Sequence, residues 1–292
     1  EPVRKTIKAG YFVNVKVSIF GHFFTTVFEG LNRQPVYNTP VGMPGGSVET
    51  TLAENEAWMD DIFHNRFNSA VILGDRHFPF KTLMRYRNEL EQINFVFMDN
   101  SSLTFPAANR ILVDWHEVGY LGAKHFIDTG HRKLAVLSVS QLQDMYCRQM
   151  GVKNHDHSQC ILDGIEQAYA DAGIDFFENV KVVNDQKNAE GPERSMRDIA
   201  QCFDEDCTAF LAVGDSRAKK IYTIANERKL EIGRDVAVVG IFNMPVCDMM
   251  LPELSSISIN EAEIGHLTAQ AIREDWRGQT RLVKPELIVR KS

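Results

Sequence analysis

The strongest constraint on the fold is a regular alternation of short apolar runs with longer amphipathic stretches along the chain. Runs such as Ser69–Leu73 (SAVIL) and Lys133–Leu137 (KLAVL) are apolar at nearly every position, which is typical of parallel strands buried on both faces. Between such runs, apolar residues recur at helical spacing; the stretch Val118–Thr129 ends at Gly130, a residue suited to a helix C-cap. This order predicts an α/β fold with helices on both faces of parallel sheets.

The alternation occurs in two successive series, and it therefore predicts two doubly wound parallel-sheet lobes. At roughly 100–200 residues per domain, a chain of 292 residues suits that number. Because open parallel sheets bind ligands beyond the carboxyl ends of their strands, we expect functional residues directly after the strands. The predicted strands are Ile7–Val13, Ser69–Leu73, Phe95–Met98, Arg110–Val113, Lys133–Leu137, Val180–Val183, Ala209–Val213 and Val236–Gly240.

Charge and cysteine content limit the partners and the compartment. The net charge is −7 and no cluster of Lys and Arg is present, which argues against DNA contact by these residues themselves. Five scattered cysteines fit reduced thiols in a cytoplasm better than a secreted disulfide framework. No apolar run is long enough to span a membrane, and we expect no membrane contact. Because the chain begins with Glu1 rather than Met, we expect an upstream segment.

Motifs for catalysis, cofactors and metals are not found in the sequence. The patterns G-x-S-x-G, G-x-x-x-x-G-K-[ST] and G-x-G-x-x-G are missing, so we predict neither an enzyme nor a bound cofactor. His155, Asp156, His157 and Cys160 are metal ligands by type, but their spacing matches no standard zinc site. A polar loop is the favoured interpretation, and no metal site is predicted.

Five segments, in order and spacing, resemble LacI/GalR-type transcription regulators. The resemblance covers most of residues 129–292 and is weaker in the first half, where Gly21-His22-Phe23-Phe24 stands at the usual Asn-Pro-Phe-Phe. The segments are Thr129–Leu137 (TGHRKLAVL), Ala209–Lys220 (AFLAVGDSRAKK), Leu230–Ile241 (LEIGRDVAVVGI), Pro252–Ile257 (PELSSI) and Lys284–Ser292 (KPELIVRKS).

This resemblance implies a periplasmic-binding-protein-like fold of type I, in which three crossovers join the lobes. We place the crossovers near Gly130, near Ile257–Asn260 and near Val283–Leu287. The N-terminal lobe would then hold residues 1–130 and 260–283, and the C-terminal lobe residues 131–259 and 284–292. The resemblance further implies a small effector, such as a sugar or a nucleobase-related metabolite, bound between the lobes. It also implies a homodimer that binds operator DNA through a DNA-binding domain absent from this chain.

The candidate ligand-binding residues are taken from positions that follow predicted strands. In the first half they are Phe20 and His22, in a loop that carries ligand contacts in the family, together with Arg76 and Asp114. Aromatic rings at such an edge stack on sugar or base faces, although the neighbouring Phe23 and Phe24 are more often core anchors of the following helix. Asp114 has an alternative role as the cap of the following helix.

In the second half the candidates are Ser138, Asp215, Arg217, Phe242 and Asn243. Ser138, which follows a predicted strand, suits a polar ligand but is equally an ordinary loop residue. A carboxylate at Asp215 would accept hydrogen bonds from ligand hydroxyls, although it could instead cap the helix that follows. Arg217 would supply forked donors to the same ligand, or lie on the surface. Phe242 stands where the family usually has Asp, so it could stack on a ring or pack at the rim of the lobe. Asn243 would act as a hydrogen-bonding group.

The sequence therefore predicts the ligand-sensing core of a bacterial transcription regulator. A ligand that binds one arrangement of the lobes better than another would shift the population and change operator affinity. The alternative is a periplasmic-type sugar-binding protein for transport or chemotaxis, and an enzyme on an α/β fold is less favoured. A helix-turn-helix segment before Glu1 would support the regulator, whereas a secretory leader would support the transport protein.

Overall fold

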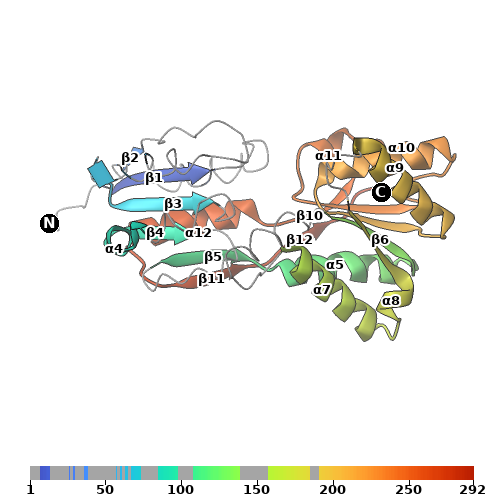
Figure 1. Cartoon of the computed structure of the whole chain (residues 1–292), viewed down its shortest axis with the longest axis horizontal. Helices are drawn as coiled ribbons and strands as arrows, with labels where there is room; N and C mark the ends of the chain where they lie inside the picture. Colours follow the sequence, from blue (N-terminus) through green and yellow to red (C-terminus); the bar gives the residue numbers. More distant parts are fainter. Residues whose placement is uncertain are drawn as a thin grey trace. The chain divides into compact units, whose positions relative to one another are not determined.

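The computed structural model describes two compact units, each built on its own sheet (Figure 1). Unit 1 comprises Glu1–Val113 and Asn260–Val283, and unit 2 comprises Asp114–Ile259 and Lys284–Ser292. None of the helices in the described part of the chain is long and apolar enough to cross a membrane. The described residues are 7–13, 36–38, 67–73, 85–97, 108–138, 157–184 and 191–292, together with residues 26, 29, 57, 60, 63 and 64.

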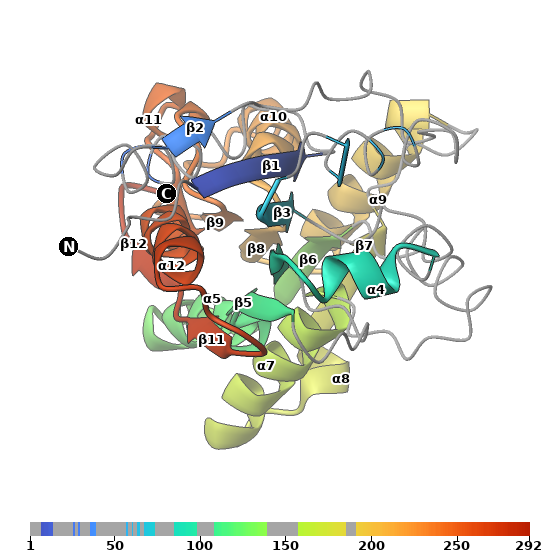
Figure 2. The same ribbon diagram turned by 90° about the vertical axis from the view of Figure 1, so that its left-hand side faces the viewer.

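Unit 1 contains a six-stranded sheet in the order β11-β5-β4-β3-β1-β2, and all of its neighbouring strands are parallel. Two helices, α4 (Arg87–Leu90) and α12 (Glu261–Arg273), lie on opposite faces of this sheet (Figure 2). The strands are β1 (Ile7–Val13), β2 (Val36–Asn38), β3 (Ser69–Leu73), β4 (Asn94–Phe97), β5 (Asn109–Val113) and β11 (Thr280–Val283).

Unit 2 contains a second six-stranded sheet in the order β12-β10-β9-β8-β6-β7, parallel except for the antiparallel pair of β12 with β10. Helices α5 and α7 cover one face, and α9 and α10 cover the other (Figure 1). The elements are α5 (Trp115–Asp128), β6 (Leu134–Ser138), α7 (His157–Asp171), α8 (Phe176–Asn179), β7 (Val180–Asn184), α9 (Gly191–Asp204), β8 (Ala209–Ala212), the 3₁₀ turn η2 (Asp215–Arg217), α10 (Ala218–Glu227), β9 (Ala237–Ile241), α11 (Val246–Met249), β10 (Ser255–Ser258) and β12 (Glu286–Ile288).

These two sheets confirm the predicted fold class of two doubly wound, parallel-rich lobes. The predicted helix end at Gly130 is confirmed as well. Gly130 has a φ of 94°, its amide donates to the carbonyl of Ile127, and the amide of His131 donates to the carbonyl of Phe126. That pair of bonds is the Schellman motif, which favours glycine because no Cβ opposes the left-handed backbone.

The first boundary between the units differs from the predicted one. We placed it near Gly130, but the structure places it between Val113 and Asp114, so that α5 belongs to unit 2. The physical reason is the close packing of α5 on α7. Gly119 of α5 lies against the carbonyl of Ile161, and Gly164 of α7 lies against the carbonyl of His116. The other boundaries fall between residues 259 and 260 and between residues 283 and 284.

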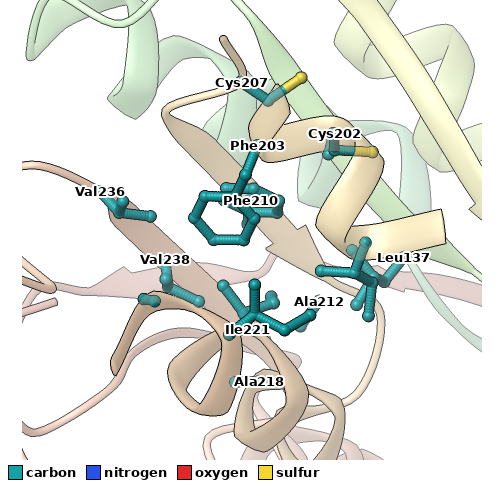
Figure 3. Close-up of a cluster of buried hydrophobic side chains, with 14 of the residues drawn as sticks. Leu137, Cys202, Phe203, Cys207, Phe210, Ala212, Ala218, Ile221, Val236 and Val238 are labelled. Atoms are coloured by element: carbon teal, nitrogen blue, oxygen red, sulfur yellow. The ribbon is translucent and has the colours of Figure 1, made fainter. Parts of the chain in front are cut away.

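The core of unit 2 contains a stacked aromatic pair between helix and sheet. The rings of Phe203 in α9 and Phe210 in β8 are 4.5 Å apart at 28°. Val238 of β9 and Ile221 of α10 continue the same buried cluster (Figure 3). Because each such side chain contributes about 1.5–3 kcal/mol when fully buried, the cluster fixes α9 and α10 on one face of the sheet.

We predict that Gly164→Ala destabilises unit 2, although alanine favours a helix by about 1 kcal/mol relative to glycine. The added Cβ would overlap the backbone carbonyl of His116, which cannot move without separating α5 from α7. Overpacking of this kind costs about 1–3 kcal/mol, so a net loss is expected in denaturant unfolding. The control Glu166→Ala, at an exposed position of the same helix, should change stability by less than about 0.5 kcal/mol. A Gly164→Ala chain as stable as the wild type would contradict this packing.

Candidate functional site

One buried carboxylate in unit 2 joins the segments that follow β8 and β9 to the neighbouring strand β10. Asp215 follows β8 at the start of η2, and its side chain is 0% exposed. One carboxylate oxygen accepts a hydrogen bond from the Oγ of Ser256 in β10 at 2.6 Å. The other accepts from the backbone amide of Met244, after β9, at 2.7 Å. A single side chain thus connects three neighbouring segments at the edge where a parallel sheet binds ligands.

The environment of Asp215 favours its uncharged form. Burial raises the pKa of Asp215, while hydrogen bonds from the amide of Met244 and the side chains of Ser256 and Cys247 act in the opposite direction. The approach of β9 is close, since a Cβ on Gly240 would overlap an oxygen of this carboxylate. Glycine at that position therefore makes room for the buried acid.

Two residues after β9 take an unusual backbone conformation. Phe242 has a φ of 98° and Asn243 a φ of 51°, both on the left-handed side. For residues other than glycine, such backbone costs of order 1–3 kcal/mol and persists only where the surroundings hold it. Here the amide of Phe242 donates to the carbonyl of Ile257 at 2.8 Å, and the amide of Asn243 donates to the Oγ of Ser256 at 3.0 Å.

The side chain of Asn243 is held by an arginine from the C-terminal tail. Its Oδ1 accepts a hydrogen bond from Arg290 at 2.9 Å. The same guanidinium donates to the carbonyl of Leu254 and pairs with Asp248, both at 2.9 Å. The tail residues 284–292 therefore take part in building this edge of the sheet.

An aromatic cluster borders the same edge. The ring of Trp115, at the start of α5, stacks on His157 at the start of α7, with 4.3 Å between centroids. The rings of Phe242 and Trp115 form a T-shaped pair, with 6.1 Å between centroids. Trp115 is buried, whereas Phe242 and His157 are half-buried. Part of the Phe242 surface is thus open to solvent beside rigid aromatic neighbours.

The structure places the candidate residues of unit 2 in different settings. Phe242 and Asn243 lie together at the edge, as their positions after β9 predict. Asp215 is fully buried, so it positions its neighbours and offers no surface to a ligand in this arrangement. Arg217 is half-buried, and its guanidinium donates to the carbonyl of Val213 at 2.5 Å. Ser138 is the last residue of β6.

Asp114 takes the second of the two roles that the sequence left open. Its carboxylate accepts a hydrogen bond from the amide of Glu117 at 3.0 Å and caps α5. The predictions for Phe20, His22 and Arg76 fall outside the described residues. Sequence reasoning gave no role to Ser256 or Arg290, although both lie in segments that resemble the regulator family.

A family model describes this fold. The model of the periplasmic binding protein-like domain matches residues 123–292, which is more than half of the chain. The chain belongs to this family. Similar curated proteins include the HTH-type transcriptional repressor PurR of Photobacterium profundum, 23% identical over 276 residues, or 92% of this chain and 77% of the repressor. The ribose operon repressor of Haemophilus influenzae is 22% identical over 281 residues, again 92% of this chain and 77% of the repressor.

Solved structures of LacI-family regulators share the periplasmic binding protein-like fold of the chain. A LacI family transcriptional regulator from Enterococcus faecium with bound ribose has a TM-score of 0.75 at 15% identity and covers 98% of both chains. The lac repressor dimer bound to operator and an anti-inducer has a TM-score of 0.69 at 16% identity, over 99% of this chain and 94% of the repressor. These findings confirm the predicted resemblance to LacI/GalR-type regulators.

We predict that the free energy of unfolding of the wild type, minus that of Asp215→Asn, increases as pH falls below neutral. Burial raises the pKa of Asp215 in the folded chain, so the folded state binds this proton more readily than the unfolded state. The stabilisation that Asp215 contributes is fully present below the pKa that it has in the unfolded chain. It is lost as pH rises through the higher pKa that it has in the folded chain. Asn cannot titrate, and denaturant unfolding of both chains across this range measures the difference.

A control with the opposite sign is available in unit 2. The hydrogen bond from Arg234 lowers the pKa of Asp235, which is half-buried. The stabilisation from that group is therefore present above the pKa that it has in the unfolded chain, and it is lost as pH falls through the folded pKa. The difference between the wild type and Asp235→Asn should therefore decrease towards acid. If the difference for Asp215→Asn also decreases towards acid, or does not change with pH, the buried position of the Asp215 carboxylate is wrong.

Proposed function

We propose that this chain is the effector-sensing core of a bacterial transcription regulator of the LacI/GalR type, acting in the cytoplasm. The observation that carries the proposal is the constrained carboxyl edge of unit 2. There, hydrogen bonds to the carbonyl of Ile257 and the Oγ of Ser256 hold Phe242 and Asn243 in strained backbone conformations, and the same Oγ donates to the buried Asp215. Strain that persists at such an edge is typical of ligand sites. The curated relatives, which are repressors by name, match 92% of the chain and support the same function.

The proposed effector is a small molecule with a ring, such as a sugar. Related regulators have been solved with ribose, cellobiose and sucrose bound. In this chain the half-buried ring of Phe242 stands at the edge, braced by Trp115, and the carboxylate of Asp215 is withdrawn into the core. A flat apolar surface next to polar backbone favours the face of a ring over an isolated charged group. Ser138, Phe20, His22 and Arg76 stay predictions as further contacts.

Operator binding and assembly are part of the same proposal. One structural relative is a lac repressor dimer bound to operator DNA. We propose that this chain likewise forms a homodimer and contacts operator DNA through a DNA-binding domain absent from it. The chain itself has a net charge of −7, which suits a sensor better than a surface for phosphates. Sedimentation at several protein concentrations tests the homodimer, and a chain that stays monomeric throughout would rule it out.

Regulation would follow from differential affinity. An effector that binds one conformation better than another shifts the population towards it, and coupling to a second ligand such as an operator is typically about 1–3 kcal/mol. The periplasmic-type sugar-binding protein is not favoured, because the curated relatives are repressors. We propose no catalytic step, since the edge described here holds its carboxylate buried and hydrogen-bonded.

We predict that Phe242→Ala weakens effector binding by about 1–2 kcal/mol, roughly 5–30-fold in Kd, because a stacking surface is lost. A thermal-shift screen of sugars and nucleosides identifies the ligand, since a ligand at about 100 times its Kd should stabilise the chain by about 2.7 kcal/mol. Calorimetry then compares the variants.

The matched control is Phe177→Ala, because Phe177 is an 82% exposed aromatic residue of the same unit, in α8. It should bind the ligand as the wild type does. If no sugar or nucleoside stabilises the chain, or if Phe242→Ala binds with unchanged affinity, the proposed effector class or its site is wrong.

A further inference from the structure

The C-terminal end of α9 brings two cysteines together. Asp206, just beyond the helix, has a φ of 64°, and its amide donates to the carbonyl of Phe203 at 3.2 Å. The amide of Cys207 donates to the carbonyl of Cys202 at 3.0 Å. These bonds form a Schellman motif, in which the first and last residues of the turn are side-chain neighbours. In α9 those two residues are Cys202 and Cys207.

Other helices of unit 2 show what the motif does to the pair at its ends. After α5, the amide of His131 donates to the carbonyl of Phe126, and the two rings meet edge to face at 6.4 Å. After α7, the amide of Ile174 donates to the carbonyl of Tyr169 at 2.9 Å. The same geometry that joins two rings after α5 therefore joins two thiols after α9.

The two thiols lie in unlike surroundings. Both side chains are buried beside the Phe203–Phe210 stack, and Cys207 is the slightly more exposed of the two (Figure 3). The hydrogen bond from Cys202 and the charge of Lys181 lower the pKa of Cys207. The hydrogen bond to Cys207 and burial raise the pKa of Cys202, whose thiol also lies 3.3 Å from the carbonyl of Asp198.

We propose that Cys202 and Cys207 are a reversible oxidation site, forming an intramolecular disulfide when the chain meets a peroxide. The observation that carries the proposal is the Schellman turn, which holds two thiols as side-chain neighbours across five residues of sequence. Cys207 is the attacking thiolate, and Cys202 is the resolving thiol. The proposal stands on the end of α9 alone and is independent of effector binding.

The chemistry balances with hydrogen peroxide as the oxidant. The Cys207 thiolate attacks one peroxide oxygen, so that an S–O bond forms and the O–O bond breaks, giving a sulfenic acid and hydroxide. The sulfur of Cys202, losing its proton, then attacks the sulfur of Cys207. The S–S bond forms as the S–O bond breaks, and the leaving hydroxide and the released protons become water. Overall, two thiols and one peroxide give one disulfide and two waters.

The test is peptide mapping of the wild-type chain after mild oxidation. The folded chain is treated with hydrogen peroxide, its remaining thiols are alkylated after unfolding, and the digest is analysed by mass spectrometry with and without dithiothreitol. We expect a Cys202–Cys207 cross-link that lacks two hydrogens and disappears on reduction. Cys160 and Cys247, which are not in a disulfide in the structure, should stay alkylatable.

Variants separate the two roles. In Cys202→Ser, the sulfenic acid on Cys207 should persist and react with dimedone, whereas Cys207→Ser should give no dimedone adduct at position 202. The control Cys160→Ser should form the disulfide as the wild type does. Oxidised wild-type chain in which Cys202 and Cys207 both remain alkylatable, or in which either is linked to another cysteine, would overturn the proposal. Peptide mapping of the oxidised wild-type chain tests the disulfide even if a variant fails to fold.

Discussion

The hydrogen-bonded burial of the Asp215 carboxylate is the interaction on which the candidate site depends. A carboxylate without exposure is costly unless donors satisfy it, and here the hydroxyl of Ser256 and the amide of Met244 do so. Because those donors belong to β10 and to the loop after β9, the acid can stay buried only while three segments keep their places. Because an unsatisfied buried carboxylate would be costly, the position of Asp215 constrains the backbone of these three segments.

The shape of this edge follows from that constraint. Ser256 donates to Asp215 and accepts from the amide of Asn243, so a single hydroxyl connects the acid to the strained turn. Arg290 adds a second restraint on Asn243 from the tail of the chain. Phe242, next in the turn, presents its half-buried ring beside Trp115. A preformed edge of this kind reduces the ordering that a bound ligand must impose.

The sequence predicted the fold better than the site, for physical reasons. Continuous apolar runs indicate burial on both faces of a sheet, which is a local property, and the central strands of both sheets followed from them. The edge strands β2, β11 and β12 and the strand β10 were not predicted, because these short segments are not continuous apolar runs. Phe242 and Asn243 follow β9, as the sequence predicted, and their contact with a ligand stays a prediction. The burial of Asp215 was not predictable, because the local sequence around an Asp after a strand is the same whether its side chain contacts a ligand or Ser256. The packing of α5 on α7 depended on Gly119 and Gly164, whose contacts are distant in sequence.

A double-mutant cycle on Asp215 and Ser256 tests the central claim most directly. The free energies of unfolding of Asp215→Ala, Ser256→Ala and the double variant are measured by denaturant titration against the wild type. Removing either partner leaves the other buried and unsatisfied, so we expect the two substitutions to be coupled by about 1–3 kcal/mol. Effects that simply add would show that the two side chains do not interact, and the carboxylate would not organise this edge.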